Sequence, residues 1–502
     1  MNQIELIALS PVLFVTASAV GLMLLAAFKV KPIVLNGFTL LGLVATLAAM
    51  LWADNLAPVQ VTPLLIVDRF ALFYSALIVL AGMVVTLLSG RYLHSLGLHV
   101  VQPGRQAHLS AEYYVLLLTA VLGAMVLVCS RHFAALFLGL ELLGVSLYVL
   151  VAYLAPLSEQ RAASLEAGMK YLILSGVASA ILLFGVALLY AEFGTLEYSR
   201  LGEIWSVSGS HNSKIVVAGL ALLLSGICFK LSLVPFHMWT PDVYEGAPVT
   251  VTALVATVSK GAVFALLLRL VFETGAFSSS AIMSVMAVIA IASMLIGNLL
   301  ALLQRNVKRI LAYSSIAHIG YLLVVLLAGA NRQTAIDLIN EAAGFYLVAY
   351  FVMTLGAFGV ISVLSRAGNA CDQDQLAEYR GLFWRAPGMA LILTAMLLSL
   401  AGIPLTVGFI GKFYVVVVGV QAMMWLLLGA LVLGSAIGLF YYLRFVVVMF
   451  MPAERESAKT EPRFVAPGDR LVLSALLVLL LWLGVFPDPL VRFIQSTTLG
   501  WF

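Results

Sequence analysis

Four lysines and one glutamate lie inside stretches that are otherwise apolar and long enough to cross a membrane. They are Lys170, Lys230, Lys260, Lys412 and Glu141. A charge at the centre of a bilayer costs about 2.5–3.5 kcal/mol on insertion scales, so such residues are candidates for function. A buried lysine gives up its proton more readily than an exposed one, and a nearby carboxylate opposes that loss. A line of lysines beside a carboxylate is therefore a candidate proton relay with an electrostatic switch.

The four lysines differ in what surrounds them in the sequence. Lys230, Lys260 and Lys412 have no carboxylate three or four residues away. For these three, the structural alternative to a relay is a bond to Glu141 or to a backbone carbonyl. Lys170 follows Glu166 by four residues, which places both on one helix face and favours an ion pair. A purely structural role is a stronger alternative for Lys170 than for the other three.

Other polar residues in the apolar stretches are weaker candidates. Arg269 and Arg444 lie near the ends of their stretches, where arginine can extend to the membrane surface, and arginine does not release its proton. His318 lies in mid-span, and histidine titrates near neutral pH. It can serve in the relay, or it can be a packed neutral histidine bonded to a carbonyl. We expect the remaining histidines, including His237, to be solvated.

Two of the apolar stretches contain a proline that should break a helix. Pro235 follows Lys230 by five residues, and Gly402-Ile-Pro404 precedes Lys412. Proline removes a backbone hydrogen bond and frees a carbonyl, which membranes tolerate where the backbone faces protein or a wet cavity. Paired breaks at matching positions are typical of inverted repeats in transporters.

Composition shows what kind of element must position these residues. Apolar residues make up 63% of the 502 residues and charged residues 10%, against roughly 45–50% and 25% in soluble proteins. A soluble enzyme, a coiled coil and a disordered chain are therefore excluded.

The sequence has no basic run typical of nucleic-acid binding, no nucleotide-binding loop, and no cysteine or histidine spacing typical of a metal site. We expect no cofactor and no metal in this chain, so energy must come from a gradient or a partner.

The apolar stretches predict an all-α polytopic membrane protein with about fourteen transmembrane helices. The expected helices span 4–28, 33–52, 70–90, 113–130, 133–154, 167–190, 214–234, 250–273, 280–303, 310–329, 340–365, 388–418, 422–451 and 470–492. The connections are too short for a further domain, so residues 1–502 form one membrane domain. We divide it into N-terminal helices in 1–112, five-helix repeats in 113–273 and 280–451, and a last helix in 470–492.

The distribution of basic residues predicts how the chain is oriented. Connections that follow odd-numbered helices carry 15 lysines and arginines, and the opposite side carries 6. The more basic side faces the cytoplasm in most membrane proteins. Both termini are therefore predicted on the outer, periplasmic face of a bacterial inner membrane.

Three segments together resemble a known family. They are Phe229–Pro248, Ala167–Ser175 around Lys170, and Gly402–Tyr414 around Lys412. The first of them contains the motif Trp-Thr-Pro-Asp-Val-Tyr. They are similar to the antiporter-like membrane subunits of proton-pumping NADH:quinone oxidoreductase, respiratory complex I, and most closely to its N subunits. The resemblance extends from the fourth to the thirteenth helix. It implies fourteen helices, two inverted five-helix repeats, and breaks in the seventh and twelfth helices.

The resemblance also implies roles for individual residues. Glu141 matches the acidic residue of helix 5, Lys230 the lysine of broken helix 7, and Lys412 the lysine of broken helix 12. Lys170 and Lys260 match the lysines of helices 6 and 8. The activity that the resemblance implies is proton translocation coupled to quinone reduction elsewhere, and His318, from its mid-span position, is a candidate link between the two repeats. The quinone, FMN and iron–sulfur clusters are then expected in partner subunits, with the M and K subunits as neighbours.

Three alternatives stay open at this point. One is the equivalent subunit of a photosynthetic NDH complex. A second is a free-standing cation/proton antiporter, which would exchange ions alone in vesicles. The third is a structural spacer whose polar residues only hold the bundle together.

Overall fold

Long helices account for nearly all of the structure, a computed structural model that describes residues 2–28, 30–95, 103–153, 161–208, 213–275, 279–330, 336–365, 372–452 and 466–498. The first half contains α1 (Gln3–Ala27), α2 (Pro32–Asp54), β1 (Val59–Thr62), β2 (Leu65–Val67), α3 (Arg69–Ser95), α4 (Pro103–Cys129), α5 (Phe133–Val151), α6 (Arg161–Phe193), α7 (Tyr198–Ser208) and α8 (Lys214–Leu231). The second half contains α9 (Trp239–Gly246), α10 (Val249–Leu254), the π-helical turn η3 (Val255–Ser259), α11 (Lys260–Thr274), α12 (Ser280–Leu302), α13 (Val307–Ala330), α14 (Ile336–Ser365), the 3₁₀ turn η5 (Leu376–Tyr379), α15 (Leu382–Arg385), α16 (Pro387–Ala401), α17 (Val407–Gln421), α18 (Trp425–Phe450), α19 (Pro467–Val485) and α20 (Asp488–Thr498).

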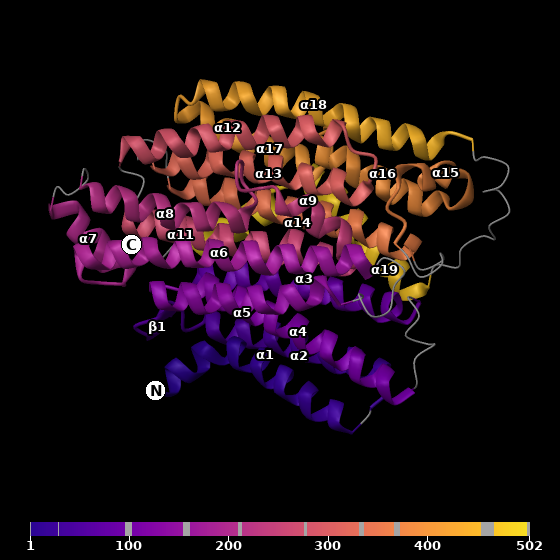
Figure 1. Ribbon diagram of the computed structural model, residues 1–502, viewed down its shortest axis with the longest axis horizontal. Helices are drawn as coiled ribbons and strands as arrows, with labels where there is room; N and C mark the ends of the chain where they lie inside the picture. The colour runs from indigo at the N-terminus through magenta and orange to yellow at the C-terminus, as the bar shows by residue number, and fades with distance from the viewer. Residues whose placement is uncertain are drawn as a thin grey trace.

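Thirteen helical segments of the described chain are long and apolar enough to cross a membrane. Two shorter apolar helices, α16 and α17, together fill the predicted stretch 388–418. The polytopic all-α prediction is therefore confirmed, and the long helices lie roughly side by side (Figure 1). A helix satisfies its own backbone groups, so it can be exposed to hydrocarbon where an open strand could not.

Burial separates a central group of helices from a peripheral one. The spans of α10–α11 and α13 are fully buried within the protein, and that of α14 is 94% buried. The spans of α1 and α2 are only 33% buried, and these two helices form one edge of the bundle in Figure 1. Apart from Gln3 and Asp54 at the helix ends, the exposed residues of α1 and α2 are apolar or small, as lipid contact requires. Polar side chains carried by the central helices are thus enclosed by protein.

Both broken helices predicted from the sequence are confirmed. The helix α8 ends at Leu231, and Ser232 adopts a left-handed conformation with a φ of 62° before the chain resumes as α9. The helix α16 ends at Ala401 and is capped by Gly402, whose φ of 91° suits glycine because it has no Cβ atom. The chain then resumes as α17 at Val407. The turn η3 forms a third irregularity, a single π-helical turn directly before Lys260.

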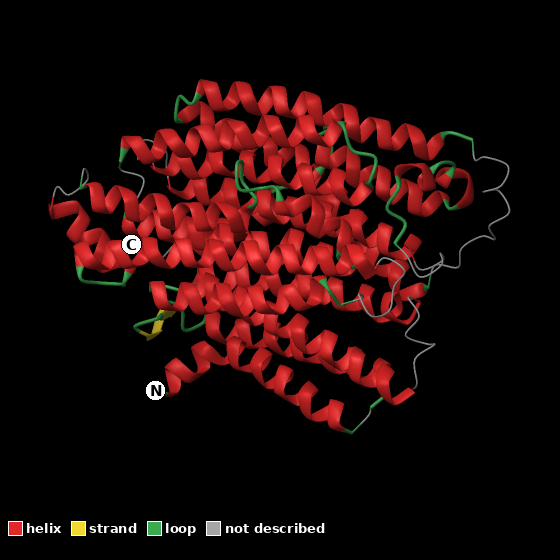
Figure 2. Cartoon of the chain, viewed as in Figure 1, coloured by secondary structure: helices red, strands yellow, loops and turns green. Residues whose placement is uncertain are grey.

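Several short elements were not predicted from the sequence. Strands β1 and β2 form a small antiparallel hairpin, visible at one side of Figure 2. Helices α7 and α20 are amphipathic segments of 11 residues each. An apolar run of about 20 residues is the sequence signal of a transmembrane helix. These segments are shorter and mix polar with apolar residues, so they lack that signal.

The two ends of the described chain lie at the same end of the bundle. Helix α2 ends at Asp54, which pairs with Arg69 at the start of α3. The Arg69 guanidinium also donates a hydrogen bond to the Ser496 carbonyl in α20. Because α1 and α2 are antiparallel neighbours joined by a short connection, α1 begins at this end too. The membrane face to which this end belongs stays a prediction. Of the basic residues used for it, Lys29, Arg366, Arg455, Lys459 and Arg463 lie outside the described residues.

Candidate functional site

Lys230 is held in the last turn of α8, directly before the first helix break. Its side chain is buried, with 4% exposure. The ammonium donates a hydrogen bond to Ser175 Oγ at 2.5 Å, and the Tyr148 hydroxyl donates to the same oxygen at 2.5 Å. Hydrogen bonds to charged groups contribute about 1.5–3 kcal/mol each. The Ser175 hydroxyl of α6 is thus the hydrogen-bond acceptor for the charged Lys230 of α8.

Glu141 reaches the same region from α5. Its carboxylate accepts a hydrogen bond from Ser179 Oγ at 2.6 Å. Ser175 and Ser179 are four residues apart in α6, and therefore lie on one face of that helix. A Cβ atom at Gly144, three residues after Glu141, would lie 3.5 Å from Lys230 Nζ. Within the described structure, Glu141 and Lys230 are thus brought together through two serines and not through a direct ion pair.

Lys260 lies at the centre of the molecule, at the start of α11. It is 1% exposed, and its ammonium donates a hydrogen bond to Ser315 Oγ of α13 at 2.6 Å. The Tyr244 hydroxyl lies 3.5 Å from the same oxygen, and the Tyr244 ring centroid lies 5.7 Å from Lys260 Nζ. The π-helical turn η3 directly precedes Lys260, and such turns often occur at functional sites.

His318 lies one turn beyond Ser315 on α13. It is buried, with 3% exposure, and its Nδ1 atom lies 2.7 Å from the Tyr346 hydroxyl. The rings of Tyr321 and Tyr350 lie 5.5 and 5.6 Å from the imidazole centroid. The Tyr321 ring also lies beside Lys412, so His318 and Lys412 share this neighbour. The Nδ1 partner is a tyrosine hydroxyl and not a backbone carbonyl, so the structural alternative to a relay role is a packed histidine bonded to Tyr346.

Lys412 uses the backbone of the second helix break. Its ammonium donates a hydrogen bond to the Ala401 carbonyl at 2.8 Å, at the end of α16. The same ammonium lies 5.2 Å from the centroid of the Tyr321 ring, a cation–π distance. Helix α13 therefore presents Ser315 to Lys260, then His318, then Tyr321 to Lys412. These three residues cover about 9 Å of the helix axis at 1.5 Å per residue.

Lys170 is placed differently from the other lysines. Its side chain is 40% exposed and forms ion pairs with Glu166 at 2.6 Å and Asp242 at 2.7 Å. The pair with Glu166 was predicted from their spacing, whereas Asp242 was missed because it lies 72 residues away. Asp242 also pairs with Arg309 of α13 at 2.9 Å. A cluster of acidic and basic side chains thus joins α6, α9 and α13.

Two expectations about polar residues were wrong. Arg269 does not extend to the membrane surface, because it is 1% exposed and its guanidinium donates to both carboxylate oxygens of Asp68 at 2.8 Å. His237 is not solvated, because only 6% of it is exposed. Lys308, one of the 15 basic residues counted in the connections, is also buried, with 0% exposure, and donates to Asp372 at 2.9 Å. In each case a distant segment covers the side chain, and the local sequence gives no sign of that.

Arg444 has the structural role expected from its place near a helix end. Its guanidinium donates hydrogen bonds to the carbonyls of Leu302 at 2.8 Å and Gln304 at 2.7 Å. It thereby satisfies carbonyls that the C-terminus of α12 leaves without intrahelical partners.

Among the described residues, no group of three or more histidine, cysteine or acidic side chains is arranged to hold a metal. Of the three cysteines in the sequence, Cys371 lies outside the described residues.

Comparison with known proteins places this architecture in a family. The transmembrane family described as NADH:quinone oxidoreductase/Mrp antiporter matches residues 130–438. A curated relative, NADH-quinone oxidoreductase subunit N of Ectopseudomonas mendocina (strain ymp), is 47% identical over 99% of this chain and 97% of its own length. A chain of respiratory complex I from Thermus thermophilus with bound aureothin has a TM-score of 0.79 and 32% identity, over 96% of this chain and 98% of that one.

Two more distant structures share the fold. A chain of the membrane-bound sulfane sulfur reductase, an archaeal respiratory membrane complex, has a TM-score of 0.82 at 23% identity, covering 98% of this chain and 97% of its own. A chain of the Mrp complex from Dietzia sp. DQ12-45-1b has a TM-score of 0.80 at 20% identity, covering 99% and 97%. The fold and its buried lysines define a polytopic membrane protein of the antiporter-like class. The chain belongs to the NADH:quinone oxidoreductase/Mrp antiporter transmembrane family, and within it to subunit N of NADH-quinone oxidoreductase.

Proposed function

We propose that the chain translocates protons as a membrane-arm subunit of NADH:quinone oxidoreductase. The observation that carries this proposal is the series of buried Lys230, Lys260 and His318 followed by half-buried Lys412, in which each member contacts a hydroxyl or carbonyl of another helix. Lysine can release a proton when it is buried, and serine and tyrosine hydroxyls both donate and accept hydrogen bonds. The series therefore has the chemistry that stepwise proton transfer requires.

In this mechanism the charge of Glu141 controls Lys230. While the carboxylate is close, it favours the protonated lysine, and a rearrangement that withdraws it favours release of the proton toward Lys260. Ser175 and Ser179 are placed to transmit such a change, because they contact Lys230 and Glu141 from one face of α6. His318 then passes the proton between Lys260 and Lys412. Lys170 stands at the uptake side, where its exposure gives access to water.

The proposal includes the surroundings of the chain. Its relative from Ectopseudomonas mendocina is a subunit of an enzyme complex by name. We propose that the neighbouring subunits are M and K, that quinone, FMN and iron–sulfur clusters reside in partner subunits, and that both termini face the periplasm. Moving one charge against 100 mV costs about 2.3 kcal/mol, so the redox chemistry of the partners must supply the energy. The two five-helix units, 113–273 and 280–451, belong to the same proposal.

Replacement of the buried lysines tests the proposal in the assembled complex. We expect Lys230→Ala and Lys412→Ala to lower the number of protons pumped per electron while the complex remains assembled. Proton uptake into inverted membrane vesicles is measured together with NADH oxidation in the same sample. Lys31→Ala is the matched control, because Lys31 is an exposed lysine that precedes α2. Unchanged pumping in both buried variants would favour the structural spacer instead.

The second candidate is a cation/proton antiporter, because the chain shares its fold with a chain of an Mrp complex. That likeness concerns the fold and does not by itself favour exchange of cations. Purified chain reconstituted into vesicles distinguishes the two. We expect no exchange of Na⁺ or K⁺ for protons by the chain alone. Exchange that Lys230→Ala abolishes would establish the antiporter and overturn the proposed function.

A further inference from the structure

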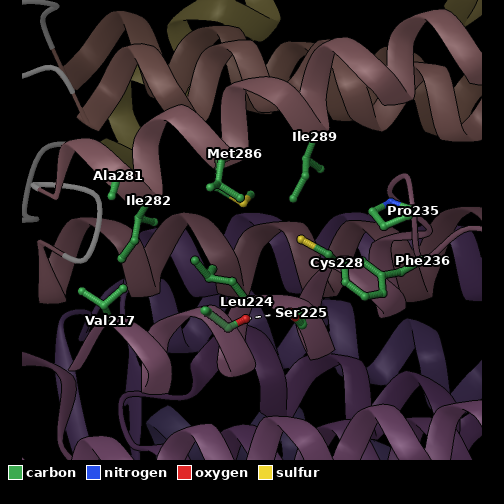
Figure 3. A pocket seen from close by; sticks show the side chains of 12 residues that line it. Val217, Leu224, Ser225, Cys228, Pro235, Phe236, Ala281, Ile282, Met286 and Ile289 are labelled. Atoms are coloured by element: carbon green, nitrogen blue, oxygen red, sulfur yellow. Dashed lines mark hydrogen bonds between the residues drawn. The ribbon is translucent and has the colours of Figure 1, made fainter. Parts of the chain in front are cut away.

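An apolar groove runs along the outer surface of α8. This helix carries Lys230 and breaks directly after it. The groove has a volume of about 360 Å³ and lies between α8 and α12 (Figure 3). Val217, Leu224 and Cys228 line it from α8, and Ile282, Met286 and Ile289 face them from α12. Pro235 and Phe236, from the break itself, close one end, as Figure 3 shows.

The groove opens to the outside of the bundle. Val285, which lines one rim, is 59% exposed, whereas Met286 in the wall is 1% exposed. The one polar side chain in the lining, Ser225, donates its hydrogen bond to the Ala221 carbonyl of its own helix. The groove therefore offers no free hydroxyl proton to a polar ligand, and its occupant must be apolar along its length.

The length of the groove fits one leaflet of a membrane. From Val217 to Cys228, its α8 wall covers eleven residues, or about 17 Å at 1.5 Å per residue. One leaflet contributes about 15 Å of hydrocarbon, half of the usual thickness. Both walls belong to helices that are long and apolar enough to span the membrane. An extended acyl chain lying parallel to these helices matches that space.

A basic residue stands at the open end of the groove. Lys214 begins α8, one turn before Val217, and it is exposed. At 100° per residue, positions 214, 217, 221, 224 and 228 fall within one stripe of the helix, so Lys214 lies on the groove side of α8. A lysine at a membrane surface attracts lipid phosphate. The charge at one end and the apolar trough behind it are complementary to an anionic phospholipid.

We propose that this groove binds an anionic phospholipid, with its phosphate at Lys214 and one acyl chain along α8 and α12. The end of that chain lies against Cys228, Pro235 and Phe236. Cys228 is two residues from Lys230, so the lipid packs against the segment where α8 breaks. Its binding stabilises this break in the conformation seen here. The lipid site is independent of whether the lysines move protons.

Photolabelling of the assembled membrane complex tests the site. The probe is phosphatidylglycerol with a photoactivatable diazirine in the acyl chain, and labelled peptides are mapped by mass spectrometry. We expect label in 217–228 and 281–289. Ala221→Phe fills the groove from the α8 side and should remove most of that label. Ala218→Phe is the matched control, because Ala218 is exposed on the same helix but does not line the groove.

A second pair of variants distinguishes loss of the lipid site from misfolding of the chain. Val285→Phe narrows the groove from α12, whereas Val288→Phe changes an equally exposed valine outside it, at 65% exposure against 59%. Lys214→Ala should lower labelling by the anionic probe about fivefold, the contribution of one basic residue near a membrane surface. Labelling that survives both groove variants, or that falls equally in the controls, overturns the site. Cross-linking of the groove to a partner subunit in place of lipid also overturns it.

Discussion

At the scale of single residues, the proposed relay residues are bonded to hydroxyl groups more than to opposite charges. Lys230 and Lys260 each donate to a serine of a neighbouring helix, and His318 contacts a tyrosine. The sequence identified the lysines because a charge in an apolar stretch is conspicuous. It did not identify Ser175, Ser179 or Tyr346, because serines and tyrosines are common in membrane helices, and only the packing shows which of them meet a lysine.

Two adjacent serines of α13 provide a residue-scale test. Ser315 accepts the hydrogen bond of Lys260, whereas Ser314 bonds to the Tyr442 hydroxyl, and both are 2% exposed. Ser315→Ala removes the acceptor of a charged donor, worth about 1.5–3 kcal/mol. We expect proton pumping in vesicles to fall about tenfold in Ser315→Ala and little in Ser314→Ala, a factor that corresponds to about 1.4 kcal/mol. Equal effects of the two changes would argue against a specific role for Ser315.

At the scale of elements, the two broken helices have a common use. Each places a lysine beside an interruption, Lys230 before the first and Lys412 after the second. Prolines in the sequence predicted both interruptions. The π-helical turn before Lys260 was not predicted, because no residue in Val255–Ser259 marks such a turn. The ion cluster around Asp242 also required the structure, since it joins segments from three helices.

Gly402 tests the second break. Its φ of 91° is unfavourable for any residue with a Cβ atom, and an added Cβ would lie 3.0 Å from Lys412 Cδ. We expect Gly402→Ala to destabilise the subunit by about 1–2 kcal/mol and to lower pumping by displacing the lysine. Gly388→Ala is the control, because a Cβ there would meet open space. Thermal denaturation of the purified complex and vesicle pumping report the two effects. A Gly402→Ala complex with unchanged pumping would show that Lys412 does not need this exact geometry.

At the scale of the whole molecule, buried ion pairs connect parts of the chain that the sequence keeps apart. Arg269 of α11 is bonded to Asp68, before α3, and to Glu273, and Glu273 also pairs with Arg131. This cluster attaches the N-terminal helices to the helix that begins with Lys260. The order and number of the spans were predictable from apolar runs. Their mutual packing was not, because membrane helices are apolar on all sides and their pattern shows no inner face.

Loss of Arg269 should therefore destabilise the assembly and not only one helix. Arg269→Met leaves the buried Asp68 carboxylate without its guanidinium partner and leaves Glu273 paired with Arg131 alone. Breaking a buried pair of this kind costs about 3–5 kcal/mol. Arg69→Met, which removes an exposed pair with Asp54, should cost at most about 1 kcal/mol. The amount of chain recovered in the complex and its thermal stability measure both. Adding Asp68→Asn to Arg269→Met should restore part of the loss. If Arg269→Met matches Arg69→Met, the buried cluster does not hold the two parts together.

In the proposed mechanism, Lys260 transfers a proton by releasing and regaining it. Lys260→Arg keeps the positive charge at this buried position but does not release a proton under any ordinary condition. The decisive measurement is the ratio of protons pumped to electrons transferred in vesicles that contain the assembled Lys260→Arg complex. The account predicts a ratio clearly below that of the unaltered complex at the same rate of NADH oxidation. An unchanged ratio would contradict it, because a fixed charge would then suffice where a transferable proton is required.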